Sequence, residues 1–182
     1  MNVVIRPSMP VDGPAISRLV LAAFGDEGPD IVQLIDALLD DATARPLASL
    51  VASVDDTVAG HVMFSRAVIG DSGPAVTASI LAPLAVHPDF QRQGLGRRLV
   101  EAGLAVQAAS GVDLVFVLGD PALYSRFGFE LAGPRGFRAP YPLSPLYEAG
   151  WQVQVLHAAR GEAVKGRVKC ADALSAPRYW QE

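Results

Sequence analysis

The sequence predicts a mixed α/β domain built around one sheet. Two observations predict it: segments with helical periodicity precede a run of strand-like segments, and a strand–helix–strand unit with a closing pair of strands completes the chain. An order of this kind is typical of a sheet with helices packed against it. The 182 residues suit one domain covering residues 1–182, with enough apolar side chains for a substantial core.

A short strand and two helices are expected first. Residues 3–6 have strand character, and residues 8–12 look like a helix start with Pro10 in the first turn. A break at residues 24–29, rich in Gly, Asp and Glu, separates the first helix from the second. Apolar residues recur at helical spacing in both helices. They are Ile16, Leu19, Val20 and Ala23 in the first, and Ile31, Leu34, Ile35 and Leu38 in the second.

Three strands are expected in mid-chain. Residues 50–54 and 58–69 form a predicted hairpin around a turn at Asp55 and Asp56. Residues 70–74 are a predicted turn cluster, and residues 79–86 form a third, long apolar strand.

A strand–helix–strand unit follows this meander. Residues 94–110 are a predicted helix, whose buried face is expected to consist of Leu95, Leu99, Ala102 and Val106. Residues 112–118 are a continuous apolar run, as expected of a strand covered on both faces. Residues 122–126 predict a short helix, and residues 129–131 predict the start of another strand.

The C-terminal part is expected to hold one long loop and two strands. Pro and Gly recur through residues 133–150, which predicts the loop. Residues 151–157 and 164–170 predict a closing pair of strands.

Composition limits the kinds of partner. The net charge of −4 argues against broad nucleic-acid binding. Cys170 is the only cysteine, so neither an internal disulfide nor a zinc cluster of thiolates can form. The chain starts without a signal-peptide pattern, and no apolar run approaches the roughly 20 residues that span a bilayer. We therefore expect a cytoplasmic protein without a nucleic-acid or membrane partner.

The most informative stretch joins the third strand to the long helix. After Leu84-Ala-Val-His-Pro comes a polar loop, Gln91 to Gly96, which leads directly into the helix. The N-terminus of a helix favours anions, because its first N–H groups have no intrahelical partner and the helix dipole is positive there. Three arginines add local positive charge, unless they form only a solvated helix face: Arg92, Arg97 and Arg98.

Two common phosphate motifs do not fit this loop. A P-loop requires a lysine after its last glycine, and the stretch contains none. A dinucleotide fingerprint requires a third glycine, but Gly94-Leu-Gly96 is followed by Arg97-Arg-Leu.

A third motif fits. Gln91-x-x-Gly94-x-Gly96 resembles motif A of the GNAT superfamily of N-acetyltransferases. Tyr124-Ser-Arg-Phe-Gly128-Phe129 resembles that family's Tyr-x-x-x-Gly-Phe ending, and Gly60-His-Val-Met-Phe-Ser resembles the opening of its third strand. The order of elements around the loop also matches. The resemblance covers about residues 3 to 131, and the sequence is similar overall to the small, YhbS-like bacterial branch.

The resemblance implies a GNAT-like fold, with a mostly antiparallel central sheet, splayed fourth and fifth strands, and helices on both faces. It implies acetyl-CoA as the co-substrate. The residues assigned to its pyrophosphate are Gln91, Arg92, Gln93, Gly94, Leu95, Gly96 and Arg97. The strand Leu84, Ala85 and Val86 would pair with the pantetheine arm, and one of its N–H groups would polarise the thioester carbonyl. Pro83 suits an interruption in pairing, because it lacks an N–H.

The reaction implied is direct attack of an amine on the acetyl thioester. By resemblance Tyr124 is the general acid that protonates the departing thiolate, since their ordinary pKa values of about 10 and 8.5 are close. An aromatic residue that only packs against a helix is the alternative.

The general base is assigned less directly. Glu27 lies in the break between the first two helices, where the family builds its acceptor site. Its neighbours Asp26 and Asp30 allow the alternative of an acidic surface turn, with Asp30 as a helix N-cap. Asp120 is expected to cap the helix that carries Tyr124. Three aromatic residues flank the Pro-rich loop and either line an acceptor pocket or cover the core: Tyr141, Tyr147 and Trp151.

No metal site is proposed, because His61 and His157 lack partners at ligand spacing and His87 belongs to a His-Pro pair that is expected to be structural. The expected activity is acetyl-CoA-dependent N-acetyltransfer, an acyltransferase reaction. The acceptor is a small-molecule amine, or a protein N-terminus or lysine. The alternative is a non-catalytic acyl-CoA-binding regulatory module on the same fold. Since family members often dimerise, a homodimer is a further expectation.

Overall fold

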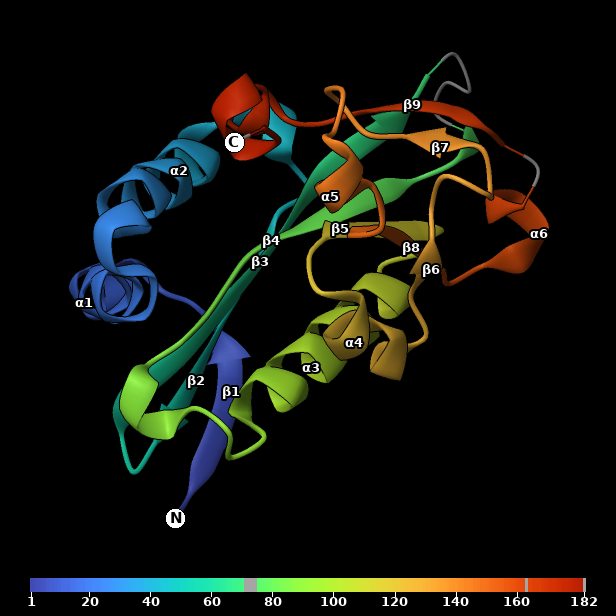
Figure 1. The fold of residues 1–182 in the computed structure, drawn as a ribbon. Coiled ribbons are helices and arrows are strands. Elements are labelled where there is room, and N and C mark those ends of the chain that lie inside the picture. The colour runs from blue at the N-terminus through green and yellow to red at the C-terminus, as the bar shows by residue number, and fades with distance from the viewer. Residues whose placement is uncertain (71–74, 163, 182) are drawn as a thin grey trace.

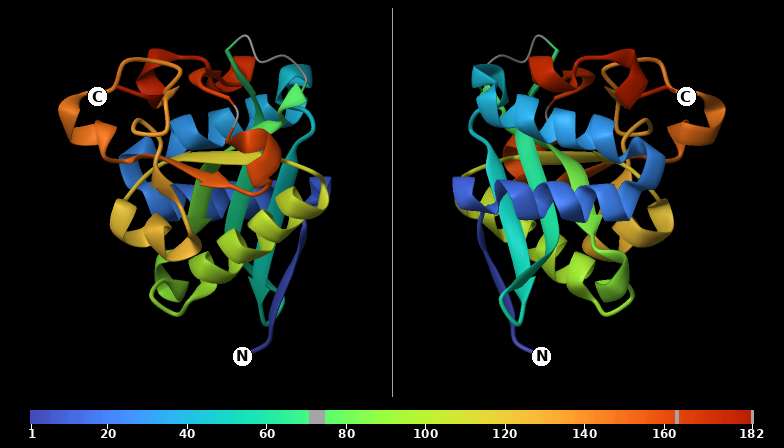
Figure 2. Two further views of the ribbon diagram at one scale, coloured as in Figure 1. Left: turned by 90° about the vertical axis from the view of Figure 1, so that its right-hand side faces the viewer. Right: turned by 90° about the vertical axis from the view of Figure 1, so that its left-hand side faces the viewer.

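The computed structural model describes residues 1–70, 75–162 and 164–181. It is a twisted sheet with helices on both faces (Figures 1 and 2). The main sheet has the order β1-β2-β3-β4-β5-β8-β6. Its strands are β1 (Val3–Pro7), β2 (Ala48–Val54), β3 (Thr57–Ile69), β4 (Ala78–Val86), β5 (Leu114–Leu118), β6 (Glu130–Leu131) and β8 (Trp151–Val155).

The described strand pairs are antiparallel except for two. β4 runs parallel to β5, and β7 (Phe137–Arg138) runs parallel to β9 (Gly166–Lys169). The expected mixed α/β fold with a mostly antiparallel sheet is therefore confirmed.

The helices divide between the two faces. α1 (Gly13–Phe24) and α2 (Gly28–Asp40) cover one face, whereas α3 (Leu95–Ala109) covers the other with α4 (Pro121–Tyr124) beside it (Figure 1). α5 (Pro145–Glu148) and α6 (Ala158–Gly161) are single turns in the C-terminal part. The described 3-10 turns are Pro10–Asp12, Gly25–Glu27, Ala42–Ala44, Pro88–Phe90, Ser125–Phe127, Asp172–Leu174 and Pro177–Tyr179.

Each face has its own apolar core. On the first face the predicted helix positions Leu19, Val20 and Leu38 pack against inward side chains of the sheet. On the second face Leu95 and Leu99 of α3 do the same. Two helical layers thus hold the sheet between them, which leaves its edges and strand ends to build a site.

The predicted buried face of α3 is half wrong. Val106 is 39% exposed and Ala102 is only half-buried. The buried positions after Leu99 are Val100, Gly103, Leu104 and Gln107. The face shifts because α3 comes very close to β3: a Cβ on Gly103 would lie 2.2 Å from the ring of Phe64.

The C-terminal strands do not form the expected pair. β8 joins β5 and β6, whereas β9 joins the far end of β3 and the short strand β7. The segment 133–150, predicted to be a loop, contains β7 and α5. Strand pairing at this distance depends on which edges the rest of the sheet leaves open, and local patterning does not report that. Of the predicted turn cluster 70–74, residues 71–74 lie outside the described residues.

Candidate functional site

β4 and β5 separate where the first part of the site begins. They pair only from Ala78 with Leu114 to Ile80 with Phe116. Beyond that point β5 pairs with β8, and β4 continues to Val86 with no partner on this side among the described strands. The expected splay of the fourth and fifth strands is present, and it exposes a row of β4 backbone groups.

A bulge explains why β4 turns away. In the β3–β4 ladder Val62 faces Leu84 and Phe64 faces Leu81, so two residues of β4 oppose one of β3. One of these two β4 residues is Pro83, which has no N–H to contribute. A bulge bends the strand that carries it. The interruption predicted at Pro83 is confirmed.

The loop after β4 is held by its own glutamines. Gln91 Nε2 donates to the carbonyl of Val86 at 2.9 Å, and Gln93 Nε2 donates to the carbonyl of Asp89 at 3.1 Å. The side chain of Gln91 therefore ties the loop to the end of β4, so the sequence motif has a structural reason at this position.

The N-terminus of α3 presents free N–H groups. The first backbone bond of the helix runs from Arg98 N to Gly94 O at 3.1 Å. Helix geometry therefore leaves the N–H groups of Leu95, Gly96 and Arg97 without an intrahelical acceptor. Gly94 has φ 81°, a left-handed conformation that favours glycine.

The space before this N-terminus is open. A Cβ on Gly94 would meet no heavy atom within 4 Å, and one on Gly96 would meet only Val86 Cγ2, at 3.5 Å. Protein packing thus does not require glycine at position 96. The residues fit a phosphate group, because free N–H groups and the positive end of a helix dipole face an open space.

The three arginines of the loop differ. Arg97 pairs with Glu101 on the exposed side of α3, with Nε 2.8 Å from Oε1. Arg98 lines a small crevice beside β1. Arg92 is exposed, has φ 60°, and forms no ion pair with any described residue. Of the three, only Arg97 forms an ion pair with a described residue, so the charges of Arg92 and Arg98 are not offset in this way.

Tyr124 lies at the end of β5. Only 7% of it is exposed, and its ring packs edge-on against Phe129 with centroids 5.7 Å apart. It also covers Gly119, where a Cβ would lie 2.4 Å from the ring. Asp120 caps the short helix as expected, accepting a hydrogen bond from the N–H of Ala122 at 2.9 Å.

Burial changes the acidity of Tyr124. Desolvation raises the pKa of its hydroxyl to about 12, because the charged phenolate is disfavoured away from water. No described residue makes a hydrogen bond to this hydroxyl. Tyr124 therefore stays protonated at physiological pH and has a free O–H, but it is a weaker acid than the ordinary value assumed from sequence.

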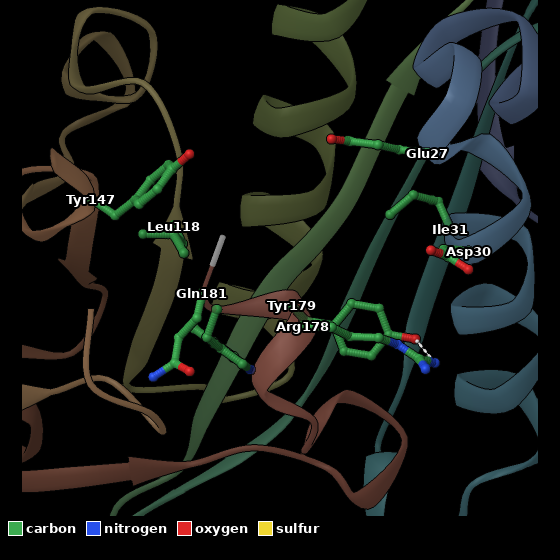
Figure 3. A pocket seen from close by; sticks show the side chains of 9 residues that line it. Glu27, Asp30, Ile31, Leu118, Tyr147, Arg178, Tyr179 and Gln181 are labelled. Atoms are coloured by element: carbon green, nitrogen blue, oxygen red, sulfur yellow. Dashed lines mark hydrogen bonds between the residues drawn. The ribbon is translucent and has the colours of Figure 1, made fainter. Parts of the chain in front are cut away.

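Glu27 lines a cavity of about 370 Å³ on the α2 side of the sheet (Figure 3). Its side chain extends from the turn between α1 and α2 toward the middle of this cavity. Leu118 and Tyr147 line the opposite side. Within the described part of the chain Glu27 makes no hydrogen bond or ion pair. Asp30, also on the wall, lies inside the first turn of α2 and is not its N-cap, which is Glu27.

The cavity and Tyr124 meet at the end of β5. Leu118, the last residue of β5, lines the cavity, and the next residue, Gly119, lies under the ring of Tyr124. Gly119 is fixed there by hydrogen bonds to β8 and the residue before it: its N–H donates to Gly150 O at 2.9 Å, and its carbonyl accepts from Gln152 Nε2 at 3.1 Å. The splayed end of β5 thus lies between the two catalytic residues proposed from sequence.

Sequence reasoning placed Ile31 and Leu118 only in a helix and a strand, and it missed the C-terminal residues of the cavity wall altogether: Arg178, Tyr179, Trp180 and Gln181. The cluster of aromatic and polar residues at the C-terminus was a weak signal, because nothing local shows where it packs. Of the three aromatic residues proposed for an acceptor pocket, Tyr147 lines this cavity. Tyr141 and Trp151 line a separate groove of about 660 Å³, and Trp151 is buried in the core.

The histidines have structural partners. His61 Nε2 is hydrogen-bonded to Ser49 Oγ at 2.9 Å, and His157 Nδ1 lies 2.9 Å from the carbonyl of Val112. His87 Nδ1 accepts the N–H of Asp89 at 3.2 Å. Among the described residues no group of His, Cys, Asp and Glu side chains is arranged to hold a metal ion. None of the described helices has the length and apolar character to cross a membrane.

Comparisons with known proteins agree with this geometry. Residues 46–131 match the family model described as an acetyltransferase (GNAT) domain. The chain is 40% identical over 162 residues to the uncharacterized N-acetyltransferase YjhQ of Escherichia coli K12, covering 88% of each chain. It is 38% identical over 139 residues to the uncharacterized N-acetyltransferase YhbS of the same strain, covering 76% of this chain and 80% of YhbS.

Two solved structures share the fold over nearly the whole chain. The Escherichia coli YhbS structure in complex with CoA has a TM-score of 0.84 and 33% identity, covering 97% of this chain and 93% of YhbS. A Brucella melitensis GNAT acetyltransferase in complex with acetyl-CoA has a TM-score of 0.75 and 28% identity, covering 95% of this chain and 98% of the other.

Proposed function

The chain belongs to the GNAT family of N-acetyltransferases, and from this premise we propose that it transfers the acetyl group of acetyl-CoA to a primary amine by direct attack. The observation that carries the proposal is the open, glycine-lined N-terminus of α3 beside the unpaired edge of β4. These two features offer an anion site and an exposed strand edge next to each other, which matches a ligand that has a pyrophosphate and an amide-bearing arm.

The loop and β4 would hold acetyl-CoA. The N–H groups of Leu95, Gly96 and Arg97 would face the pyrophosphate, with the charge of Arg92 nearby. Gln91 would act by positioning the loop through Val86. The backbone of β4 from Leu84 to Val86 would pair with the pantetheine arm, and one of its N–H groups would polarise the thioester carbonyl. When bound, acetyl-CoA supplies an activated acetyl group as a thioester.

Tyr124 would act on the departing sulfur. Its pKa of about 12 lies well above the value of about 8.5 of a thiol, so complete proton transfer from Tyr124 is uphill. We therefore assign Tyr124 first as a hydrogen-bond donor that stabilises the thiolate in a site with little water. A proton released by the amine can then reach the sulfur, either by relay through the Tyr124 hydroxyl or by direct transfer beside it.

Glu27 would prepare the amine. An ammonium loses one proton before it attacks, and Glu27 would accept that proton directly or through water. The new C–N bond forms as the C–S bond breaks, and the nitrogen loses a second proton. One proton ends on CoA as the thiol and one is released to solvent. The uncompensated carboxylate also attracts cationic acceptors into the cavity.

The less specific parts of the proposal concern location and assembly. We propose a cytoplasmic enzyme of one domain. A free thiol at Cys170 is compatible with a reducing compartment. Whether the chain is the homodimer expected from its family is measured by analytical ultracentrifugation.

The proposal is tested by acetyl-CoA binding and by turnover. Calorimetry is expected to show saturable binding of acetyl-CoA and much weaker binding of ATP and NAD. A thiol assay with a panel of amines is expected to show amine-dependent release of CoA. Well-folded protein without acetyl-CoA binding would contradict the whole proposal. Binding without release for any amine would instead favour the non-catalytic regulatory module.

A further inference from the structure

The inference concerns the acceptor, and it rests on the proposed function. One wall of the cavity that contains Glu27 is formed by the C-terminal segment Arg178 to Gln181 (Figure 3). Its volume of about 370 Å³ is in the range of small-molecule pockets. The chemistry of its walls therefore indicates which kind of small molecule fits.

The C-terminal wall is firmly anchored. Trp180 is only 4% exposed and packs edge-on against Trp151 at 5.7 Å, and its Nε1 donates to the carbonyl of Leu174 at 3.0 Å. Gln181 Nε2 donates to the carbonyl of Pro142 at 2.8 Å. Tyr179, between Pro177 and these anchors, is therefore held as a fixed wall of the cavity.

The charged side chains of the cavity wall are two carboxylates, Glu27 and Asp30, and one guanidinium, Arg178. The charge of Asp30 helps to raise the pKa of Arg178, after the larger effect of the Tyr179 hydroxyl. The Arg178 guanidinium lies 4.9 Å from the centre of the Tyr179 ring and donates to its hydroxyl at 2.9 Å. No ion pair joins Arg178 to Asp30 among the described residues, and with Glu27 the three groups give the cavity wall a formal charge of −1. Glu27, with no partner among the described residues, provides a site for a single positive charge.

Apart from the amide of Gln181, the rest of the wall is apolar or aromatic. Ile31 and Leu118 contribute aliphatic surface, and Tyr147 and Tyr179 contribute aromatic rings from two sides (Figure 3). Aromatic rings at the wall of a pocket favour a flat, apolar ligand body. The formal charge of −1 on this wall matches one ammonium better than several, and a carboxylate on the ligand would lie close to Glu27 and Asp30.

We infer that the acceptor is a primary monoamine on a compact apolar body, with aromatic bodies preferred. Its ammonium is bound by Glu27, and its body lies between Tyr147 and Tyr179. Tyr179 is then a specificity-determining residue, and the C-terminus of the chain completes the acceptor pocket. Polyamines and amino acids fit these walls less well because of their charges, and a peptide N-terminus fits less well because a cavity of about 370 Å³ suits a small molecule.

The first test compares acceptors by CoA release. Phenethylamine is expected to have a kcat/KM at least about ten-fold above that of phenylalanine, which differs only by its carboxylate, and above that of spermidine and of a tripeptide with a free N-terminus. A preference for spermidine, phenylalanine or the peptide overturns this inference while leaving acetyl transfer in place. No CoA release with any amine overturns the proposed function, and this inference with it.

The second test asks whether Tyr179 in the cavity wall binds the acceptor. Tyr179→Ala is expected to raise the KM for phenethylamine about ten-fold without changing the KM for acetyl-CoA, and Tyr179→Phe is expected to keep most of the affinity because it keeps the ring. Tyr141→Ala is the matched control, because Tyr141 also contacts the C-terminal segment, through Ser175 at 3.1 Å, but lines the other groove. An equal rise of KM in both alanine variants, or none in Tyr179→Ala, overturns the assignment.

Discussion

At the scale of single residues, the environment of Tyr124 decides what it can do. Its spacing to Gly128 and Phe129 is readable in the sequence, but its acidity depends on burial against Gly119 and Phe129. With a pKa of about 12 the hydroxyl donates a hydrogen bond over the whole working range and does not itself titrate there.

Tyr124→Phe is expected to lower kcat about 100-fold while leaving the Kd for acetyl-CoA unchanged, because the variant loses only a donor to the leaving sulfur. The wild-type rate should also show no decline from loss of the Tyr124 proton below pH 11. Steady-state kinetics and calorimetry measure these values. Phe127, packed beside Tyr124 at 6.4 Å, offers a control in Phe127→Leu, which should keep kcat. Equal kcat values for Tyr124→Phe and wild type would show that Tyr124 has only a packing role.

His61 is a second residue whose surroundings matter more than its identity. It is fully buried on β3, and Nδ1 has no hydrogen-bond partner among the described residues. Burial lowers its pKa to about 4, although the charge of nearby Asp12 opposes this. The folded protein therefore holds His61 neutral.

The pH dependence of stability follows from this shift. Between pH 6.5 and 4 the unfolded chain binds a proton at His61 that the folded chain does not, so the free energy of unfolding falls as pH falls. The loss attributable to His61 amounts to up to about 3 kcal/mol, and it is complete near pH 4. Urea unfolding at several pH values measures it. In His61→Gln this part of the slope should disappear, and an unchanged slope would refute the assignment.

At the scale of elements, the loop and the first turn of α3 act as one unit. Gln91 ties the loop to β4, the left-handed Gly94 begins the helix, and Gly96 lines an open space. Glycine occurs at these two positions for different reasons. The backbone conformation requires glycine at position 94, but no protein contact requires it at position 96.

Gly96→Ala separates binding from folding. The variant should be as stable as wild type or more stable, by up to about 1 kcal/mol, because alanine favours a helix. Its affinity for acetyl-CoA should nevertheless fall at least about ten-fold, since the added Cβ fills the space proposed for the pyrophosphate. Thermal melts and calorimetry measure the two effects. Gly133→Ala, which also adds a Cβ in open space, is the control and should change neither. Undiminished affinity in Gly96→Ala would count against the proposed pyrophosphate site.

At the scale of the whole molecule, the C-terminal segment closes the fold onto its N-terminal helices. The N–H groups of Asp172 and Ala173 donate to Thr43 and Asp41, at 2.9 and 2.8 Å. The chain's two tryptophans, Trp151 and Trp180, make an edge-to-face contact in the core on that side. The segment that forms the cavity wall is thus joined both to α2 and to the sheet.

We expect the protein to unfold in one cooperative transition, because the C-terminal segment shares its core with α2 and β8. Tryptophan fluorescence reports this contact, and far-ultraviolet circular dichroism reports the sheet and helices. Their thermal midpoints should coincide. An earlier fluorescence transition would show that the C-terminal wall detaches first, contrary to a single-domain chain.

The sequence by itself determined the features that are local. The glycine loop and the N-terminus of α3 lie within eight consecutive residues, and helix geometry alone leaves their N–H groups free. The same holds for the cap at Asp120, the interruption at Pro83 and most helix and strand positions, because each depends on neighbours a few residues away.

Only the tertiary structure decided the features that depend on distant segments. The cavity proposed for the acceptor combines Glu27, Leu118, Tyr147 and Tyr179 from four parts of the chain. The separate partners of β8 and β9, the buried face of α3 and the raised pKa of Tyr124 are of the same kind. Their physical reason is shared: which edges and faces remain open, and which groups lose their water, is settled only when all the elements pack together.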